Sequence, residues 1–165
     1  MQGGKFNLYK KRGSFLKGAV LDPEIGTLVH VVRAEGPPLE SEVPLARTID
    51  PVRLSSSVVE LVDRLAGLID GEPEGVLISG QMHGVVLVDG DGSPQGAVHT
   101  WQDNRDTVVG PDGSPLKRLR ESLTTAEQMA TGNELRPGLP VSTLHRLVLE
   151  GTAVQDLIPA SLLSY

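Results

Sequence analysis

The residues best able to do chemistry in this sequence fall into two short polar clusters. Gln81, Met82 and His83 interrupt one apolar run, and the sequence Trp-Gln-Asp-Asn-Arg-Asp at residues 101–106 directly follows another. An indole face covers C–H groups, while amide, imidazole, carboxylate and guanidinium groups form hydrogen bonds with hydroxyls. The two clusters therefore suit a polyhydroxylated ligand.

A purely structural interpretation of the second cluster is equally open. In that interpretation Trp101 belongs to the core, and Asp103 and Arg105 pair with each other or cap the next helix. Residue types alone do not decide between the two interpretations, so the elements that carry the clusters matter.

Three predicted strands would position the clusters. The short apolar run at residues 74–80 predicts a buried strand, and the first cluster follows it directly. Residues 85–89 and 96–101 predict two more strands, joined by a Gly-Asp-Gly-Ser-Pro turn. Ligands usually bind at the carboxyl ends of strands in α/β sheets, so we expect both clusters to border one site.

The N-terminal part of the chain predicts an antiparallel meander. Residues 5–22 suggest a hairpin with a basic tip at residues 10–14, and the β-branched run at residues 27–35 predicts a third strand. Residues 50–71 predict the clearest helix, with Asp50 as N-cap, Pro51 in the first turn and Gly71 at the end. Meander, helix and buried strand together indicate an α/β fold with a mixed sheet and helices packed on it.

Three short helices are predicted in the C-terminal part. They cover residues 115–123, 125–131 and 140–150, and Thr124 or Thr125 is placed to cap the second.

The third of these helices has a predicted apolar face made of Leu144, Leu147 and Val148. The apolar final segment, residues 158–165, is an unusual end for a domain. We therefore expect residues 1–165 to form one domain that is incomplete at its C-terminus.

Composition excludes several function classes. The net charge of −6 argues against a nucleic-acid partner, because phosphate binding requires a basic face. The absence of cysteine excludes a disulfide scaffold, a cysteine zinc site and thiol catalysis, and it fits a reducing cytoplasm. No apolar run approaches the ~20 residues of a membrane span, and the first residues lack a signal-peptide core, so we expect a cytoplasmic protein without a membrane partner.

Familiar catalytic and cofactor motifs are absent. The sequence contains no phosphate-binding P-loop, no dinucleotide-binding glycine motif, no Gly-x-Ser-x-Gly elbow and no His-Glu-x-x-His motif. The four histidines are dispersed, at positions 30, 83, 99 and 145. We therefore expect no metal site.

The two clusters and their order resemble the N-terminal domain of FGGY-family carbohydrate kinases. That family has a Gly-Gln-Met-His-Gly loop, matched here at residues 80–84, and a Trp-Asn/Gln-Asp-x-Arg segment, matched at residues 101–105. Residues 131–147 also resemble the family segment that follows. The resemblance covers roughly residues 15–165 and is nearest to the xylulokinase and sedoheptulokinase branch.

The resemblance implies a ribonuclease-H-like (actin-like) domain that forms one of two domains in a kinase. It implies a sugar in the cleft between them, and ATP and Mg²⁺ bound mostly by the second domain. The residues that would line or border the sugar are Gln81, Met82, His83, Trp101, Asp103 and Arg105.

The sequence departs from the family pattern at the turn that should face the phosphates. The family has an Asp-x-Gly-Thr turn there, whereas this chain reads Lys-Lys-Arg-Gly-Ser, so Lys11, Arg12, Gly13 and Ser14 become the residues expected near phosphate. Lysine and arginine attract phosphate, but they do not bind Mg²⁺ as a carboxylate does.

The family's catalytic aspartate lies beyond the point that this sequence reaches, so the catalytic residue is unknown. Asp103 as a substitute base is disfavoured. Three hypotheses stay open. The chain could be the sugar-binding part of a kinase that needs a second polypeptide with the ATP domain, or a pseudokinase-like module that binds a sugar or a partner without phosphate transfer. The third hypothesis is a truncated reading frame with no independent role.

Overall fold

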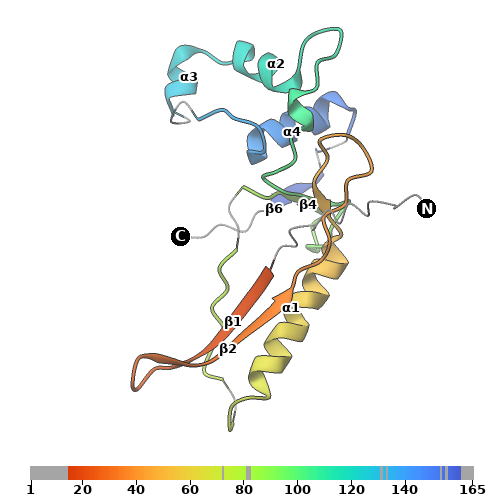
Figure 1. Ribbon diagram of the computed structural model, residues 1–165. Helices are drawn as coiled ribbons and strands as arrows, with labels where there is room; N and C mark the ends of the chain where they lie inside the picture. The colour runs from red at the N-terminus through yellow and green to blue at the C-terminus, as the bar shows by residue number, and fades with distance from the viewer. Residues whose placement is uncertain are drawn as a thin grey trace, which may run out of the picture.

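The structure is a computed structural model, with a β-hairpin and the longest helix in the first half of the chain and three shorter α-helices in the second (Figure 1). It describes residues 15–71, 73–80, 83–130, 132, 134–152, 154 and 156–160. The elements are β1 (Phe15–Asp22), β2 (Thr27–Glu35), β3 (Thr48–Ile49), α1 (Pro51–Ala66), β4 (Val86–Val88), β5 (Val98–His99), the 3₁₀ helix η1 (Arg105–Thr107), α2 (Pro115–Ser122), α3 (Thr125–Ala130), α4 (Pro140–Leu149) and β6 (Ile158–Ala160). The coarse α/β prediction is confirmed.

The β1–β2 hairpin forms where the sequence predicts the second and third strands of the meander. Its turn begins at Asp22, whose carboxylate accepts a hydrogen bond from the backbone N–H of Glu24 at 2.9 Å, and Gly26 takes the left-handed conformation that completes it. The strands pair antiparallel, with a register shift after Val20. The predicted first arm and basic tip, within residues 5–14, lie outside the described residues.

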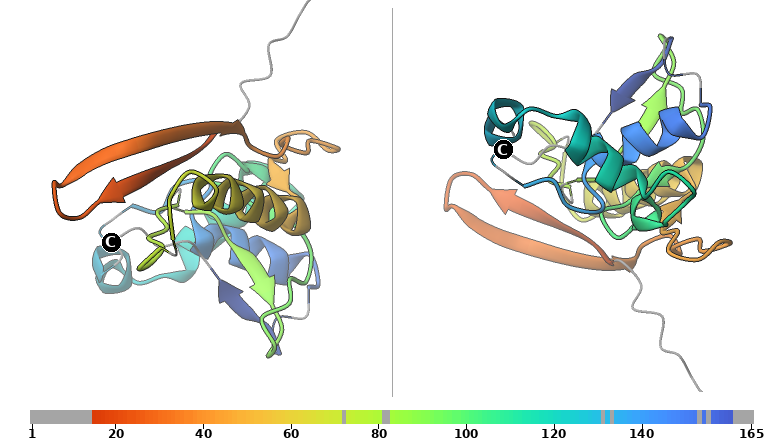
Figure 2. Two further views of the ribbon diagram at one scale, coloured as in Figure 1. Left: turned by 90° about the horizontal axis from the view of Figure 1, so that it is seen from below. Right: turned by 90° about the horizontal axis from the view of Figure 1, so that it is seen from above.

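Helix α1 starts as the sequence predicts and packs against the hairpin. The Asp50 carboxylate accepts hydrogen bonds from the first turn, at 2.8 Å from the N–H of Val52. The helix ends at Ala66, earlier than predicted, because Gly67 and not Gly71 stops it. Figure 2 shows the hairpin lying along one side of α1, where Gly18 of β1 leaves room for the side chains of Leu61 and Leu65.

The predicted mixed sheet is not formed by the described residues. Strands pair in three separate antiparallel sheets: β1–β2, β3–β5 and β4–β6. The prediction of a buried strand at residues 74–80 is wrong, because this segment has no regular structure and Leu77 is 98% exposed. A strand buried on both faces needs neighbours on both edges, and no described strand lies on either edge of this segment.

The three C-terminal helices match their predicted ranges to within one residue. Thr124 caps α3 in a reciprocal arrangement: its backbone N–H donates to the Glu127 carboxylate at 2.8 Å, and its hydroxyl accepts from the Glu127 N–H at 3.3 Å. This confirms Thr124 as the better of the two predicted caps.

The predicted apolar face of α4 is only partly confirmed: Leu144 and Leu147 are half-buried, but Val148 is 50% exposed. The fully buried residues of the helix are the polar Ser142, Thr143 and Arg146. The polar side faces inward because its groups find partners there. The hydroxyl of Ser142 donates to the carbonyl of Leu139 at 2.9 Å, and Arg146 joins the network described below.

The C-terminal apolar segment is described as far as residue 160, where β6 pairs antiparallel with β4. Residues 161–165 lie outside the described residues. No described helix has the length and apolar character needed to cross a membrane.

Replacing Gly18 with valine should weaken the contact between the hairpin and α1. A Cβ at this position would lie 2.5 Å from Leu65 Cδ1 and 3.3 Å from Leu61 Cδ2, so the added side chain overpacks the contact. We expect a loss of about 1–3 kcal/mol in the free energy of unfolding, measured by urea denaturation. Ala19→Val, on the exposed face of the same strand, is the matched control and should change stability by less than about 0.5 kcal/mol.

Candidate functional site

A single antiparallel bridge joins the residue before β4 to the last residue of β5. Val85 and His99 exchange both backbone hydrogen bonds, at 2.9 and 2.8 Å. In an antiparallel pair the residues before Val85 and those after His99 lie at the same end. His83 and Trp101 therefore share that end, as the predicted strand–turn–strand requires.

Trp101 sits on a fixed backbone with an open side chain. The residue is 44% exposed, so the interpretation of Trp101 as a core residue is wrong. Behind it, the buried backbone of Gly138 lies directly against the Trp101 carbonyl, with no room for a Cβ. Gly138 also has a φ of 77°, a left-handed conformation that favours glycine.

His83 is the one residue of the first cluster that the structure describes. It is half-buried and has a φ of 70°, which is uncommon for a residue other than glycine. Backbone strain of this kind is found preferentially at functional sites. Gln81 and Met82, and the predicted phosphate-proximal residues Lys11, Arg12, Gly13 and Ser14, lie outside the described residues.

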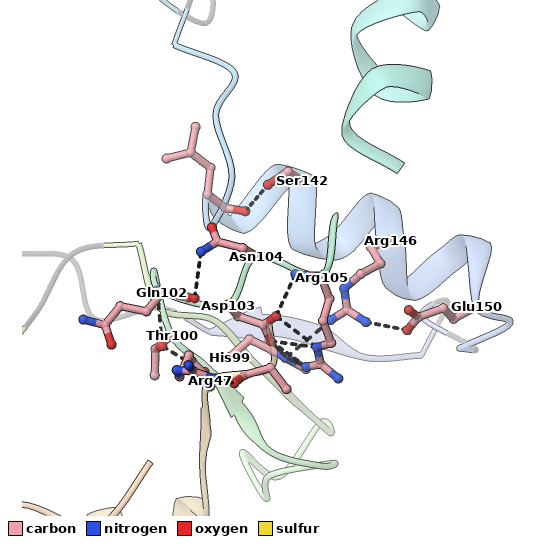
Figure 3. Close-up of polar contacts among 12 residues, drawn as sticks. Arg47, His99, Thr100, Gln102, Asp103, Asn104, Arg105, Ser142, Arg146 and Glu150 are labelled. Carbon is pink, nitrogen blue, oxygen red and sulfur yellow. Dashed lines mark hydrogen bonds and ion pairs between the residues drawn. The ribbon is translucent and has the colours of Figure 1, made fainter. Parts of the chain in front are cut away.

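Asp103 is buried and fully engaged with neighbouring side chains (Figure 3). Its carboxylate accepts hydrogen bonds from Arg105 Nε at 2.9 Å and from the Arg105 backbone N–H at 3.2 Å, and its Oδ2 lies 3.1 Å from His99 Nδ1. The pairing of Asp103 with Arg105, left open by the sequence, is thus observed. At 2% exposure, Asp103 positions Arg105 and cannot itself reach a ligand.

Helix α4 contributes a second arginine to this cluster. Arg146 is 2% exposed, and its Nη2 lies 3.4 Å from His99 Nδ1. Its Nη1 donates a hydrogen bond to the Glu150 carboxylate at 2.5 Å. Figure 3 shows both arginines converging on the His99–Asp103 pair from different elements. We call His99, Asp103, Arg105, Arg146 and Glu150 the arginine network.

The arginine network sets the ionisation of its carboxylate. Burial alone raises the pKa of Asp103, but hydrogen bonds from His99 and Arg105 outweigh it and hold that pKa well below its usual range. The same hydrogen bond to Asp103 raises the pKa of Arg105, against the opposing effect of burial. The pair is therefore ionised at neutral pH.

The second cluster is also tied to the segment before β3. The Thr100 hydroxyl donates to the carbonyl of Arg47 at 2.8 Å, and the Asn104 N–H donates to the carbonyl of Leu45 at 3.1 Å. These bonds hold both ends of the Trp101–Asp103 turn. The turn is thus anchored on one side by residues 45–47 and on the other by the arginine network.

Two buried side chains in η1 and α4 have polar atoms without a hydrogen-bond partner among the described residues. Asp106 in η1 is 1% exposed, and neither carboxylate oxygen has a hydrogen-bond partner there. The Nε2 atom of His145 on α4 is likewise buried and unpaired within the described part of the chain. Burial, followed by the charge of Arg118, lowers the pKa of His145, which favours the neutral imidazole.

The resulting arrangement offers binding groups at its surface and support beneath them. Trp101 is exposed, His83 is half-buried, and the Arg105 side chain keeps 22% exposure. Such groups can cover C–H surface and exchange hydrogen bonds with hydroxyls. None of the accessible residues is an acid placed to take a proton.

Sequence reasoning missed the supporting residues Gly138, Arg146 and Glu150. A signal for Arg146 existed, because Ser142, Thr143 and Arg146 form a polar stripe at helical spacing along α4. Nothing in the sequence context of Gly138 indicates its close contact with Trp101.

Replacing Gly138 with alanine should disturb the turn that carries Trp101. The new Cβ would collide with the Trp101 carbonyl, and alanine also disfavours the left-handed conformation. We expect a shift in the emission of Trp101, the one tryptophan of the chain, and a loss of stability well beyond ~1 kcal/mol. Gly132→Ala is the matched control: its φ is 70°, but its Cβ would meet nothing closer than Glu134 Cγ at 4.0 Å, so only the conformational cost should appear.

The arginine network should make the protein sensitive to acid. Because folding lowers the pKa of Asp103, its pairing stabilises the fold above about pH 4, where the unfolded carboxyl is ionised, and this contribution is lost as the pH falls further. Asp103→Asn should cost about 1–3 kcal/mol at neutral pH, because it removes the charged acceptor of the Arg105 guanidinium, whose side chain is 22% exposed. Denaturation curves at about pH 7 and pH 3 measure both effects. Asp112→Asn, at an exposed turn, should cost nothing measurable.

Comparisons with known proteins place the fold among sugar kinases. Three solved structures illustrate this: a ligand-bound xylulose kinase from Lactobacillus acidophilus (22% identity, TM-score 0.65, 85% of this chain covered), a gluconate kinase from the same organism (23%, 0.65, 85%) and a carbohydrate kinase from Novosphingobium aromaticivorans (16%, 0.66, 90%). No protein-family model and no curated protein matches the chain.

The matched region is a fraction of each kinase. It covers 27% of the xylulose kinase and of the gluconate kinase, and 30% of the Novosphingobium kinase. At these sequence identities the likeness concerns the fold. The described chain therefore has the fold of part of a sugar kinase.

Proposed function

We propose that this chain forms the sugar-binding part of a carbohydrate kinase, with a ketose such as xylulose or sedoheptulose as substrate. The observation that carries the proposal is the common position of His83 and Trp101 at one end of the Val85–His99 bridge. The fold shared with xylulose and gluconate kinases supports it independently.

The chemistry of the exposed groups fits this ligand class. The Trp101 indole presents an apolar face to C–H groups of a sugar, while His83 and Arg105 provide hydrogen bonds for hydroxyls. Asp103 keeps the Arg105 guanidinium in place by a charge-assisted pair. A preorganised arginine loses less freedom on binding than a free one, which favours affinity.

The described residues do not fit ATP and Mg²⁺. They contain no group of three histidine or acidic side chains able to hold a metal ion, and the buried Asp106 carboxylate is closed to a nucleotide. We therefore derive no step of phosphoryl transfer from them. In this proposal, ATP and Mg²⁺ bind a second domain or polypeptide, as the resemblance to FGGY kinases implies.

A second candidate is a module that binds a sugar or a partner without transferring phosphate. It is favoured by the burial of Asp103, the acid that the sequence places within the site. A general base has to reach the proton that it removes, and Asp103 instead accepts hydrogen bonds from Arg105 and His99. Both candidates share the sugar site and differ in whether turnover follows.

The sugar site can be tested by calorimetric titration of the chain with D-xylulose, sedoheptulose and gluconate. We expect binding of at least one of them, weakened about tenfold or more, ~1.4 kcal/mol, by Trp101→Ala and by His83→Ala. His30→Ala, at an exposed position on β2, is the matched control and should bind like the wild type. Absence of binding by the folded wild type would overturn the proposal that this chain forms a site.

The need for a second domain predicts that the chain alone does not phosphorylate these sugars. A coupled assay of ATP consumption should give the same rate with the wild type as with Trp101→Ala prepared from the same host. Turnover that depends on Trp101 would show that the chain is a kinase by itself and would remove both the second-domain requirement and the non-catalytic alternative.

A further inference from the structure

His99 uses one of its two ring nitrogens inside the arginine network (Figure 3). Its Nδ1 lies 3.1 Å from Asp103 Oδ2, 3.0 Å from Arg105 Nη2 and 3.4 Å from Arg146 Nη2. The carboxylate accepts and the two guanidinium groups donate, so Nδ1 has a partner in either neutral tautomer of the imidazole. These contacts hold the ring in place and leave the other nitrogen for a different contact.

The second nitrogen of His99, Nε2, is accessible and unpaired. No hydrogen bond or ion pair of His99 within the described part of the chain involves this atom. It is not one of the buried unpaired side-chain atoms, which among the described residues belong to Asp106 and His145. The His99 side chain keeps 13% exposure. The imidazole therefore presents a firmly held polar atom at the surface of the network.

The Arg105 guanidinium next to His99 has the same character. Its Nε donates to Asp103 Oδ1 at 2.9 Å and its Nη2 donates to Asp103 Oδ2. Its Nη1 makes no hydrogen bond with a described residue and is not buried. Because Arg105 Nη2 lies 3.0 Å from His99 Nδ1, the two groups are neighbours, and each has one unused nitrogen. Two such nitrogens can bind neighbouring hydroxyls of one ligand.

His99 also lies between the two residues that carry the proposed sugar site. It is bridged to Val85, which follows His83 by two residues, and Trp101 follows His99 by two residues. Strand side chains two residues apart point to the same face, and opposite residues of an antiparallel pair share a face. A Cβ on Gly84 would lie 3.6 Å from the His99 carbonyl, so the backbone next to His83 passes directly beside His99.

We propose that His99 is a further binding residue of this site, whose Nε2 forms a hydrogen bond with a sugar hydroxyl next to the hydroxyl bound by Arg105 Nη1. This role of His99 rests on the proposed function, because it requires a sugar beside His83 and Trp101. A hydroxyl suits Nε2 in either tautomer, since it both donates and accepts. Because Nδ1 already holds the ring, the bond costs little further side-chain freedom, which favours affinity.

The variants His99→Asn and His99→Gln test the two ring nitrogens separately. An asparagine amide reaches the position of Nδ1 but not that of Nε2, whereas a glutamine amide reaches the position of Nε2. We expect His99→Asn to weaken binding of D-xylulose or sedoheptulose about tenfold or more in calorimetric titration, and His99→Gln to bind more tightly than His99→Asn. A purely structural role through Nδ1 predicts the opposite order. His30→Asn, at an exposed position on β2, is the matched control and should bind like the wild type.

Nitrogen NMR of the imidazole side chains gives a second measurement on the wild type, which needs no variant to fold. Adding the sugar should shift the His99 Nε2 resonance and leave the His30 resonances unchanged. If the wild type binds the sugar while His99→Asn binds as tightly, or while Nε2 does not shift, this role of His99 is overturned and the proposed function stands. A folded wild type that binds neither sugar overturns the proposed function and the role of His99 together.

Discussion

The burial of one carboxylate is the constraint on which the site depends. Asp103 is removed from water, and a buried charge is tolerated only when it is paired and hydrogen-bonded. Arg105 and His99 meet that requirement, and Arg146 approaches from α4. Satisfying one charge therefore fixes the relative positions of β5, η1 and α4, and with them the turn that presents Trp101.

This requirement also explains why α4 is turned with its polar side inward. Orienting the helix by hydrophobicity would bury Val148 and expose Arg146, whereas the structure does the reverse. The buried Arg146 guanidinium is paired with Glu150, one turn further along the helix at the exposed edge of the network, and lies 3.4 Å from His99 Nδ1. The interior formed by η1, α2 and α4 is accordingly organised by ion pairs and hydrogen bonds, together with a few buried leucines such as Leu116 and Leu119.

The sequence predicted correctly those features that are decided by residues close together in the chain. The start of α1 depends on Asp50 and Pro51, and the start of α3 on Thr124 and Glu127, so neighbouring residues decide both. The Val85–His99 bridge, which places His83 and Trp101 at the same end, also follows from a short strand–turn–strand unit.

The predictions failed where a residue's environment is set by residues that are distant in the sequence. An apolar run such as residues 74–80 indicates a buried strand only if neighbouring strands exist, and periodicity carries no information about them. The roles of Arg146 and Gly138 depend on His99 and Trp101, which are far away in the sequence. The sequence left open whether Asp103 pairs with Arg105 or contacts a ligand. The structure shows the pair, with Asp103 buried.

The left-handed backbone of His83 has an evolutionary consequence. At a φ of 70° a histidine costs of order 1 kcal/mol relative to glycine. Selection for stability alone would therefore favour glycine at this position. Under the proposed function, binding of the sugar by the imidazole has to offset that cost, so lineages without this binding should drift towards glycine.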